Sequence, residues 1–447
     1  MIIKDVPQSG ITSWHSNIDA KSWNGLISAW LGWMFDGFET YAMVAVAAVA
    51  IKQLIEPSQM PHLSIYISGL FAIQLIGWAT GGIIAGILAD YIGRKRVMLY
   101  AIIAYGALAL VSAISPTYWF LFGSRFVMGI ALGGEFGAGA SLTSELWPPA
   151  IRGRVLGIIS AAFGIGFFIV AVIWLFVGQL GPSAWRIMFA IGVLPAFLAI
   201  FIRARVADPE IWVESNAKRR RLLERKKRGE PIDEADRHLL KFSAAAVFTD
   251  PVVRRRVIPL VFMMLSSLIG FWAVSTWIPQ YAGALAAQHG LEPQHWASMT
   301  ALFYTMGGTI GYVSVGFAAD AWGRKPTMWI WYLMALIMVP VTFLGVKDNS
   351  LLLWVAGING FFTLGQLSWP TIYLPEVFPT AVRVTALAFV FNITRYLVAL
   401  TTFFAGALAV WLGGLAPAAT IIGTIYVLGL LVSPFAGPET KGQPLPS

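Results

Sequence analysis

Twelve apolar stretches of about 20 residues run through the chain, and they constrain its fold more than any other feature. About 20 apolar residues cross a bilayer as a helix, and a helix satisfies its own backbone hydrogen bonds in lipid. Only 12% of the 447 residues are charged, whereas a soluble domain carries about 25%. We therefore predict an all-α membrane protein. The predicted transmembrane helices are roughly 24–52, 64–89, 97–115, 118–144, 154–180, 185–203, 257–286, 297–319, 327–346, 351–375, 384–412 and 416–436.

One long connection divides these helices into six and six. We predict an N-terminal six-helix half at 1–203, a cytoplasmic central loop at 204–256 and a C-terminal six-helix half at 257–447. The run KRRRLLERKKR at 218–228 resembles a nucleic-acid-binding patch out of context. Inside this loop we interpret it as a solvated amphipathic helix, with contact to anionic lipid as the alternative.

The positions of lysine and arginine predict the orientation. Cytoplasmic loops of membrane proteins are rich in both. If the N-terminus is inside, the outside loops hold only Lys52, Arg186 and Lys347. Two more, Arg125 and Arg395, lie inside predicted helices, which leaves 26 of the 31 basic residues in the cytoplasm. We expect a multi-pass protein of the inner cell membrane with both termini cytoplasmic. The net charge of +9 then reflects topology, and we expect no nucleic-acid partner.

Three short motifs recur in the same order in both predicted halves. The pairs are ELWPPAIR (145–152) with EVFPTAVR (376–383), GILADYIGRKR (86–96) with GFAADAWGRKP (316–326), and ADPE (207–210) with AGPE (436–439). Such spacing indicates a duplicated six-helix unit. A repeat of this kind, with a substrate site between the halves, is typical of secondary transporters.

These residues resemble the major facilitator superfamily. The twelve helices, the long central loop and GILADYIGRKR carry the likeness. Arg125 with the ELWPPAIR motif, and PETKG at 438–442, resemble the sugar-porter and organic-acid branches. FDGFE at 35–39 and GGEFG at 133–137 resemble proton symporters for carboxylates, namely the metabolite, sialate and aromatic-acid groups. The resemblance implies the major facilitator fold and alternating access.

Charged residues in the repeated motifs predict a cytoplasmic gate. We expect one ion-pair cluster within each half, and both clusters would latch the halves together when the inside is closed. An ion pair near water is worth about 0–1 kcal/mol. A network of such pairs can therefore favour the closed state over the open state without preventing opening. Anchoring of the helix ends by snorkelling charges is the alternative. The first cluster is Asp90, Arg94, Glu145 and Arg152, and the second is Asp320, Arg324, Glu376 and Arg383.

Five charges inside the predicted helices have no charged counterpart in the other half. They are Asp36, Glu39, Arg125, Glu135 and Arg395. A charge at the bilayer centre costs about 2.5–3.5 kcal/mol on insertion scales, so such residues are usually functional. Asp36 and Glu39 are three residues apart and share a helix face. Two carboxylates in a low-dielectric cavity do not both ionise easily, and a proton carrier needs this behaviour.

We predict that the first four of these five residues couple transport to protons. The resemblance to sugar porters implies that Glu39 faces Arg125, which holds the carboxylate ionised until protonation releases it. Asp36 has no counterpart in sugar porters, and it resembles an acid found in the carboxylate symporters instead. Glu135 lies among glycines, where helices pack closely, and it serves either helix packing or a second proton site.

The substrate carboxylate is expected at Arg395. The planar guanidinium fork suits a carboxylate, and aromatic-acid symporters carry an arginine near this point. An ion pair of Arg395 with Asp36 is the alternative. Further candidates are polar or aromatic residues in the second half, although tryptophans in such helices often serve packing or interfacial belts. They are Gln280, Trp277, Trp272, Asn359, Gln366, Trp369, Tyr373 and Asn392.

Together these residues favour a proton-coupled symporter that imports a small organic acid. A proton–sugar symporter is the first alternative, favoured by PETKG and by the Glu39–Arg125 pair. An organic-cation carrier and a transporter-like nutrient sensor are the others. The chain has no Walker A, H-E-x-x-H or G-x-S-x-G motif and no cysteine, so we expect no ATP drive, no enzymatic activity, and no metal or cofactor. The expected partners are the organic acid, protons and the bilayer, and the protein should function as a monomer.

Overall fold

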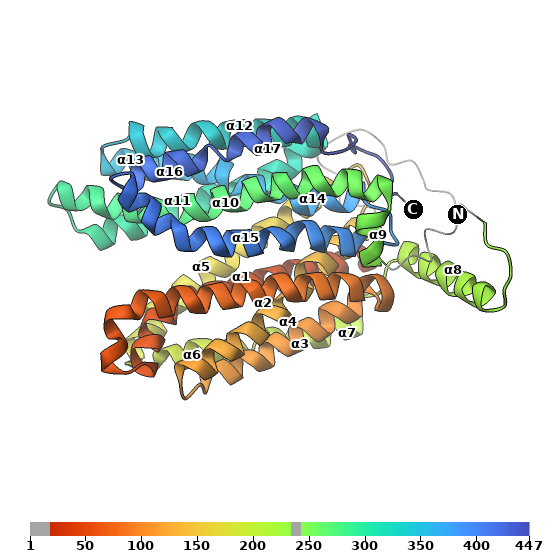
Figure 1. Ribbon diagram of the computed structural model, residues 1–447, viewed down its shortest axis with the longest axis horizontal. Helices are drawn as coiled ribbons and strands as arrows, with labels where there is room; N and C mark the ends of the chain where they lie inside the picture. Colours follow the sequence, from red (N-terminus) through yellow and green to blue (C-terminus); the bar gives the residue numbers. More distant parts are fainter. Residues whose placement is uncertain (1–17, 234–242, 447) are drawn as a thin grey trace.

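The computed structural model describes residues 18–233 and 243–446, which form helices and loops. The long helices run side by side in two bundles, one from each half of the chain (Figure 1). The N-terminal bundle holds α1 (Ala20–Leu54), α2 (Leu63–Ile92), α3 (Arg94–Ala113), α4 (Tyr118–Leu146), α5 (Arg152–Val177), α6 (Ala184–Ile191) and α7 (Pro195–Arg205). The C-terminal bundle holds α10 (Pro251–Gln288), α11 (Pro293–Trp322), α12 (Arg324–Pro340), α13 (Asn349–Thr363), α14 (Trp369–Val377), α15 (Arg383–Trp411), α16 (Leu415–Gly423) and α17 (Tyr426–Val432).

The helices agree with the predicted membrane spans. Eleven stretches of the described residues are long and apolar enough to cross a membrane, and the 30-residue α11 is a further long helix that contains the predicted span 297–319. Three predicted spans, the sixth, tenth and twelfth, are each broken into two helices, which the sequence did not predict. Proline accounts for two of the breaks, because Pro195 and Pro370 stand in the first turns of α7 and α14, where the missing N–H is tolerated.

The start of α1 and the last described residues lie at the same end of the bundles, beside α8 (Glu210–Lys227) and α9 (Ser243–Thr249) (Figure 1). We call this the gate end, and the opposite end the far end. The helix predicted at 218–228 is part of α8. Asp90 and Asp320, near the C-terminal ends of α2 and α11, lie at the gate end.

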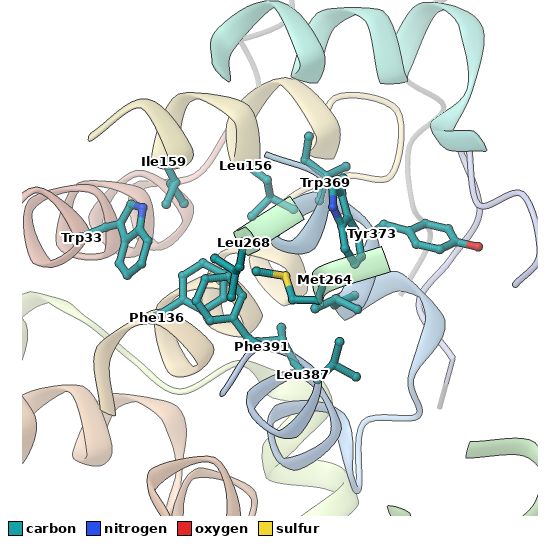
Figure 2. Close-up of a cluster of buried hydrophobic side chains, with 14 of the residues drawn as sticks. Trp33, Phe136, Leu156, Ile159, Met264, Leu268, Trp369, Tyr373, Leu387 and Phe391 are labelled. Carbon is teal, nitrogen blue, oxygen red and sulfur yellow. The ribbon is translucent and has the colours of Figure 1, made fainter. Parts of the chain in front are cut away.

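The two halves pack together mainly through α2 against α15 and α5 against α11. Glycine permits the closest approach, since a Cβ added to Gly157 of α5 would lie 2.9 Å from the Cα of Gly316 in α11. Nearer the middle of the molecule, Phe136 of α4 stacks on Phe391 of α15 with ring centroids 4.1 Å apart (Figure 2). The interface is therefore tightly packed toward the gate end.

Candidate functional site: a gate, buried charges and a central cavity

At the gate end, two aspartates bind the N-termini of helices in the opposite half. Asp90 accepts hydrogen bonds from the Thr385 backbone N–H (3.0 Å) and hydroxyl (2.6 Å) at the start of α15. Asp320 accepts one from the Arg154 backbone N–H (3.0 Å) at the start of α5. A helix N-terminus carries partial positive charge, so it favours a carboxylate there. Each half thus caps a helix of the other.

Inside each half, the arginine of the GRK sequence joins two acids of its own half. The pairs are Arg94 with Asp90 (3.5 Å) and Glu145 (3.0 Å), and Arg324 with Asp320 (2.9 Å) and Glu376 (2.7 Å). The side chains in these pairs are at most 2% exposed. The expectation of pairs near water is therefore wrong. Breaking a buried pair by removing one partner costs about 3–5 kcal/mol, more than the surface value.

The last arginine of each repeated motif pairs across the halves. Arg152 lies 3.4 Å from Glu376, and Arg383 lies 2.5 Å from Glu145. The prediction that each cluster closes within one half is wrong for these two arginines. They begin α5 and α15, the helices that pack on the opposite half, so their side chains reach across the interface.

The third repeated motif also has a structural role. The Asp208 carboxylate accepts a hydrogen bond from the backbone N–H of Lys95 (3.0 Å), at the start of α3. Glu439 accepts one each from the backbone N–H groups of Arg324 (2.8 Å) and Lys325 (3.0 Å), at the start of α12. The repeat therefore caps equivalent helices in the two halves.

The segment after PETKG lies across the gate, which the sequence did not predict. Arg383 donates to the Pro446 carbonyl (2.8 Å), and the Thr380 hydroxyl donates to the same oxygen (3.2 Å). Arg152 of the other half donates to the Gln443 carbonyl (3.3 Å). The tail thereby bonds to both arginines that cross the interface.

Glu39 of α1 and Arg125 of α4 lie next to each other inside the N-terminal half. Their Oε2 and Nη1 atoms are 3.8 Å apart, and both side chains are fully buried. The Arg125 guanidinium stacks 3.7 Å from the Phe189 ring centroid. Gly192, at the break between α6 and α7, leaves the space that the Glu39 carboxylate occupies. Within the described residues neither charged group has a hydrogen-bond partner, so the ion pair is loosely held.

Asp36 shares α1 with Glu39 but has different neighbours. Its strongest interaction with a charged group is with Glu135 of α4, followed by Arg395 of α15 and then Glu39. The Glu135 carboxylate packs against Gly32, where any Cβ would overlap it. Both carboxylates are buried, and no described residue donates a hydrogen bond to either. The charge of Glu135 therefore acts on Asp36 more strongly than the charge of Glu39 does.

Arg395 lies in the wall of a cavity of about 560 Å³ between the halves. Its guanidinium lies over the rings of Trp78 (4.0 Å to the centroid) and Phe391 (4.4 Å). Asn392, one turn before it, accepts its hydrogen bond. No carboxylate of the described chain lies within 4 Å of it, although the charge of Asp36 attracts it. Four of the five N–H donors of the guanidinium thus remain for another group.

A second cavity of about 980 Å³ adjoins the first and shares Phe163 and Trp272 with it. Its other lining residues include Val44 and Ala301, which lie in the far-end parts of α1 and α11. The central cavity therefore continues toward the far end, whereas buried ion pairs close the gate end.

This combination of duplicated halves, gate and central cavity agrees with comparisons to known proteins. The sequence pattern of the sugar (and other) transporter family matches residues 26–447. The chain belongs to this family of major facilitator transporters. It is a membrane transporter with many spans, and not an enzyme.

Relatives and solved structures extend over most of the transporter. The sialic acid transporter NanX of Escherichia coli (strain K12) is 26% identical over 386 residues, 86% of each chain. The cis,cis-muconate transport protein of Acinetobacter baylyi is 25% identical over 390 residues, covering 85% of this chain and 86% of the relative. The proton:xylose symporter XylE, solved with 6-bromo-6-deoxy-D-glucose, matches with a TM-score of 0.76 and 21% identity over 95% of this chain and 98% of that chain. This last likeness shows the fold.

Several polar residues predicted for the transporter's substrate site are bonded elsewhere. The amide of Asn359 donates to the Thr342 hydroxyl (2.7 Å). Gln366 accepts from the Ser267 hydroxyl (2.7 Å), and the Trp369 indole donates to the same hydroxyl (3.0 Å). These residues form a network inside the C-terminal half and do not line the central cavity.

The remaining predicted residues lie in varied places. Tyr373 directs its hydroxyl away from the buried cluster (Figure 2) and donates to the Pro438 carbonyl (2.7 Å). Trp277 is buried in the hydrophobic core, and Gln280 is exposed. Asn392 supports Arg395. Of the eight further candidates, only Trp272 lines the cavity.

Sequence reasoning missed most of the cavity wall. Trp33, Trp78, Phe136 and Phe163 of the N-terminal half all line it. Two of them stand beside residues that were predicted, since Trp33 is one turn before Asp36 and Phe136 follows Glu135. A search for aromatic residues flanking the unduplicated charges would have found these two.

Proposed function

We propose that the protein is a proton-coupled symporter that imports a small organic carboxylate by alternating access. One observation carries this proposal. Arg395 presents a guanidinium, without an ion-pair partner among the described residues, in the wall of the cavity between the halves. A buried guanidinium of this kind suits a carboxylate, which it can bind through two parallel hydrogen bonds.

The acids near Arg395 supply a reason for proton coupling. If Asp36 and Glu135 were both ionised, they would repel an incoming anion by several kcal/mol at an effective dielectric of about 20. Protonating Asp36 removes part of this repulsion, and it also removes the attraction between Asp36 and Arg395 that would compete with the substrate. The Glu39–Arg125 pair, 3.8 Å apart, gives a second site at which a proton would release a buried arginine.

The gate and the cavity support alternating access. In this conformation the crossed pairs of Arg152 and Arg383 close one end, and the cavity continues toward the other. The distribution of basic residues supports a cytoplasmic gate end, and with that orientation the conformation is outward-facing. We place the protein in the inner cell membrane. One chain supplies both halves and the cavity, so it functions as a monomer.

The relatives support a carboxylate more than a sugar. Sialic acid and cis,cis-muconate, for which two of them are named, are both carboxylic acids. The PETKG motif does not favour a sugar substrate here. Glu439 caps α12, and the Thr440 hydroxyl donates a hydrogen bond to the Glu376 carboxylate at the gate (2.6 Å). The motif serves the gate and lies away from the central cavity.

A thermal-shift screen tests the proposal on the purified full-length protein. The probes are benzoate, gluconate and succinate, each beside its neutral amide. At least one acid should raise the melting temperature while its amide does not. Arg395→Ala should remove this effect, Arg395→Lys should weaken it, and the exposed Arg254→Ala should leave it unchanged. If amides stabilise as well as acids, or if Arg395→Ala responds like wild type, the carboxylate assignment fails.

A further inference from the structure

The wall of the central cavity is mostly aromatic. Of its fourteen lining side chains, eight are tryptophan, phenylalanine or tyrosine, and both halves supply them. Trp33 and Phe163 stack with centroids 4.9 Å apart on one side, and Phe271 and Trp272 pack edge to face at 5.2 Å on the other. Aromatic rings favour offset-stacked or edge-to-face contact with another ring, so this wall suits a flat aromatic ligand.

Few polar side chains in the wall are available to a ligand. Apart from the indole N–H groups of the tryptophans, they are Ser160, Tyr312, Thr371 and Arg395. The Ser160 hydroxyl already donates to the Leu156 carbonyl (3.0 Å) of its own helix. A sugar or sugar acid brings several hydroxyl groups, and each loses its bonds to water on entering. Asn359 and Gln366 could have received them, but both are bonded within the C-terminal half.

The cavity wall contains one cationic side chain, Arg395. The rings of Trp78 and Phe391 both contact its guanidinium group. A second carboxylate on the ligand would lie against apolar or aromatic wall, where burying an unpaired charge is costly. The wall therefore suits one anionic group joined to one planar apolar group.

We infer that the central cavity selects an aromatic monocarboxylate, whose carboxylate binds Arg395 and whose ring packs among the cavity's aromatic side chains. This inference rests on the proposed carboxylate transport and narrows its substrate class. Sugar acids, aliphatic acids and dicarboxylates are then poor ligands of the same site.

Affinity measurements on the full-length protein in nanodiscs test it with four small acids and one amide. Benzoate and cyclohexanecarboxylate carry the same carboxylate on six-membered rings, and only the first ring is flat and aromatic. Benzoate should bind more tightly by roughly two- to tenfold, the range that ring contacts add beyond buried area. Terephthalate and gluconate should bind more weakly than benzoate, and benzamide should hardly bind.

Variants show whether the wall is responsible. Trp272→Leu keeps an apolar side chain but removes a ring, so the preference for benzoate over cyclohexanecarboxylate should fall toward one. Trp354→Leu is the matched control, because Trp354 is 67% exposed and lies outside the cavity. Its preference should equal that of wild type. If Trp272→Leu does not fold, the ratio of benzoate to cyclohexanecarboxylate affinity in the wild type alone tests the aromatic preference.

The outcomes separate the two proposals. Equal binding of benzoate and cyclohexanecarboxylate by wild type, with benzamide excluded, overturns the aromatic class and leaves carboxylate transport standing. If gluconate or terephthalate binds more tightly than benzoate, the aromatic monocarboxylate class is likewise overturned and carboxylate transport still stands. Benzamide binding as tightly as benzoate overturns carboxylate recognition itself.

Discussion

Removing the charge of Asp90 should open the gate. In the closed state Asp90 accepts two backbone hydrogen bonds from the start of α15, from Val384 (3.3 Å) and Thr385 (3.0 Å), and one from the Thr385 hydroxyl (2.6 Å). All three partners belong to the other half, so opening breaks them. The ion pair with Arg94 lies within one half and contributes to both states.

The size of the effect follows from these bonds. Asp90→Asn keeps one oxygen acceptor, so at least one bond to a charged group is lost, worth about 1.5–3 kcal/mol. The charge at the α15 N-terminus is worth about 0.3–1 kcal/mol more. A loss of about 2–4 kcal/mol raises the ratio of open to closed gate by roughly 30- to 700-fold. Asp320→Asn should act similarly through α5.

Thiol labelling measures this ratio, because the chain contains no cysteine. A single Ser160→Cys places a thiol in the central cavity wall. In inside-out vesicles an impermeant reagent reaches it only when the gate opens, so labelling should speed up in proportion to the open fraction. Asp250→Asn is the control, since Asp250 caps α10 (Val252 N–H, 2.9 Å) within one half. If Asp90→Asn and Asp320→Asn both label no faster than this control, the aspartates only anchor helix ends and the reasoning is refuted.

Three further predictions concern coupling and the tail. In proteoliposomes, Glu39→Gln should abolish benzoate accumulation driven by a pH gradient while exchange survives; accumulation by this variant would transfer the role to Asp36 or Glu135. Benzoate affinity, measured by titration, should rise as the pH falls from about 8 to about 6, because protonation removes a charge that repels the anion; Asp36→Asn should flatten this dependence, and an unchanged slope would exclude Asp36. Truncation after Gly442 removes the carbonyls that bond to both crossing arginines, so Ser160→Cys should label faster from the gate end; unchanged labelling would show that the tail adds nothing to closure.

The sequence was sufficient for the architecture. Lipid imposes a simple local rule, that a spanning helix needs about 20 apolar residues, and each span could be found without knowing its neighbours. The duplicated motifs also pointed to the residues that form the buried ion pairs of the proposed gate, because a repeat of about 230 residues is visible in the chain itself. Comparing the two repeats also shows which charged residues inside the spans occur in one half alone. They are Asp36, Glu39, Arg125, Glu135 and Arg395.

Local rules failed wherever the outcome depended on packing between distant helices. Arg152 and Arg383 were assigned to their own halves, yet each pairs with the other half. Asn359 and Gln366 were expected in the cavity, but partners on neighbouring helices of the C-terminal half use their amides. Spacing along α1 predicted that Asp36 interacts with Glu39, whereas the packing of α1 on α4 adds Glu135 as the acid with the stronger influence on it.

The sequence by itself therefore determined which segments cross the membrane, which are repeated and which charges are buried. Those properties depend on the free energy of moving each segment from water into lipid, and that free energy is set by local composition. Only the tertiary structure decided that Arg395 lies against Trp78 and Phe391 in an aromatic cavity. Its environment depends on how α2 and α15, which are nearly 300 residues apart in the chain, pack side by side. No local pattern carries that information.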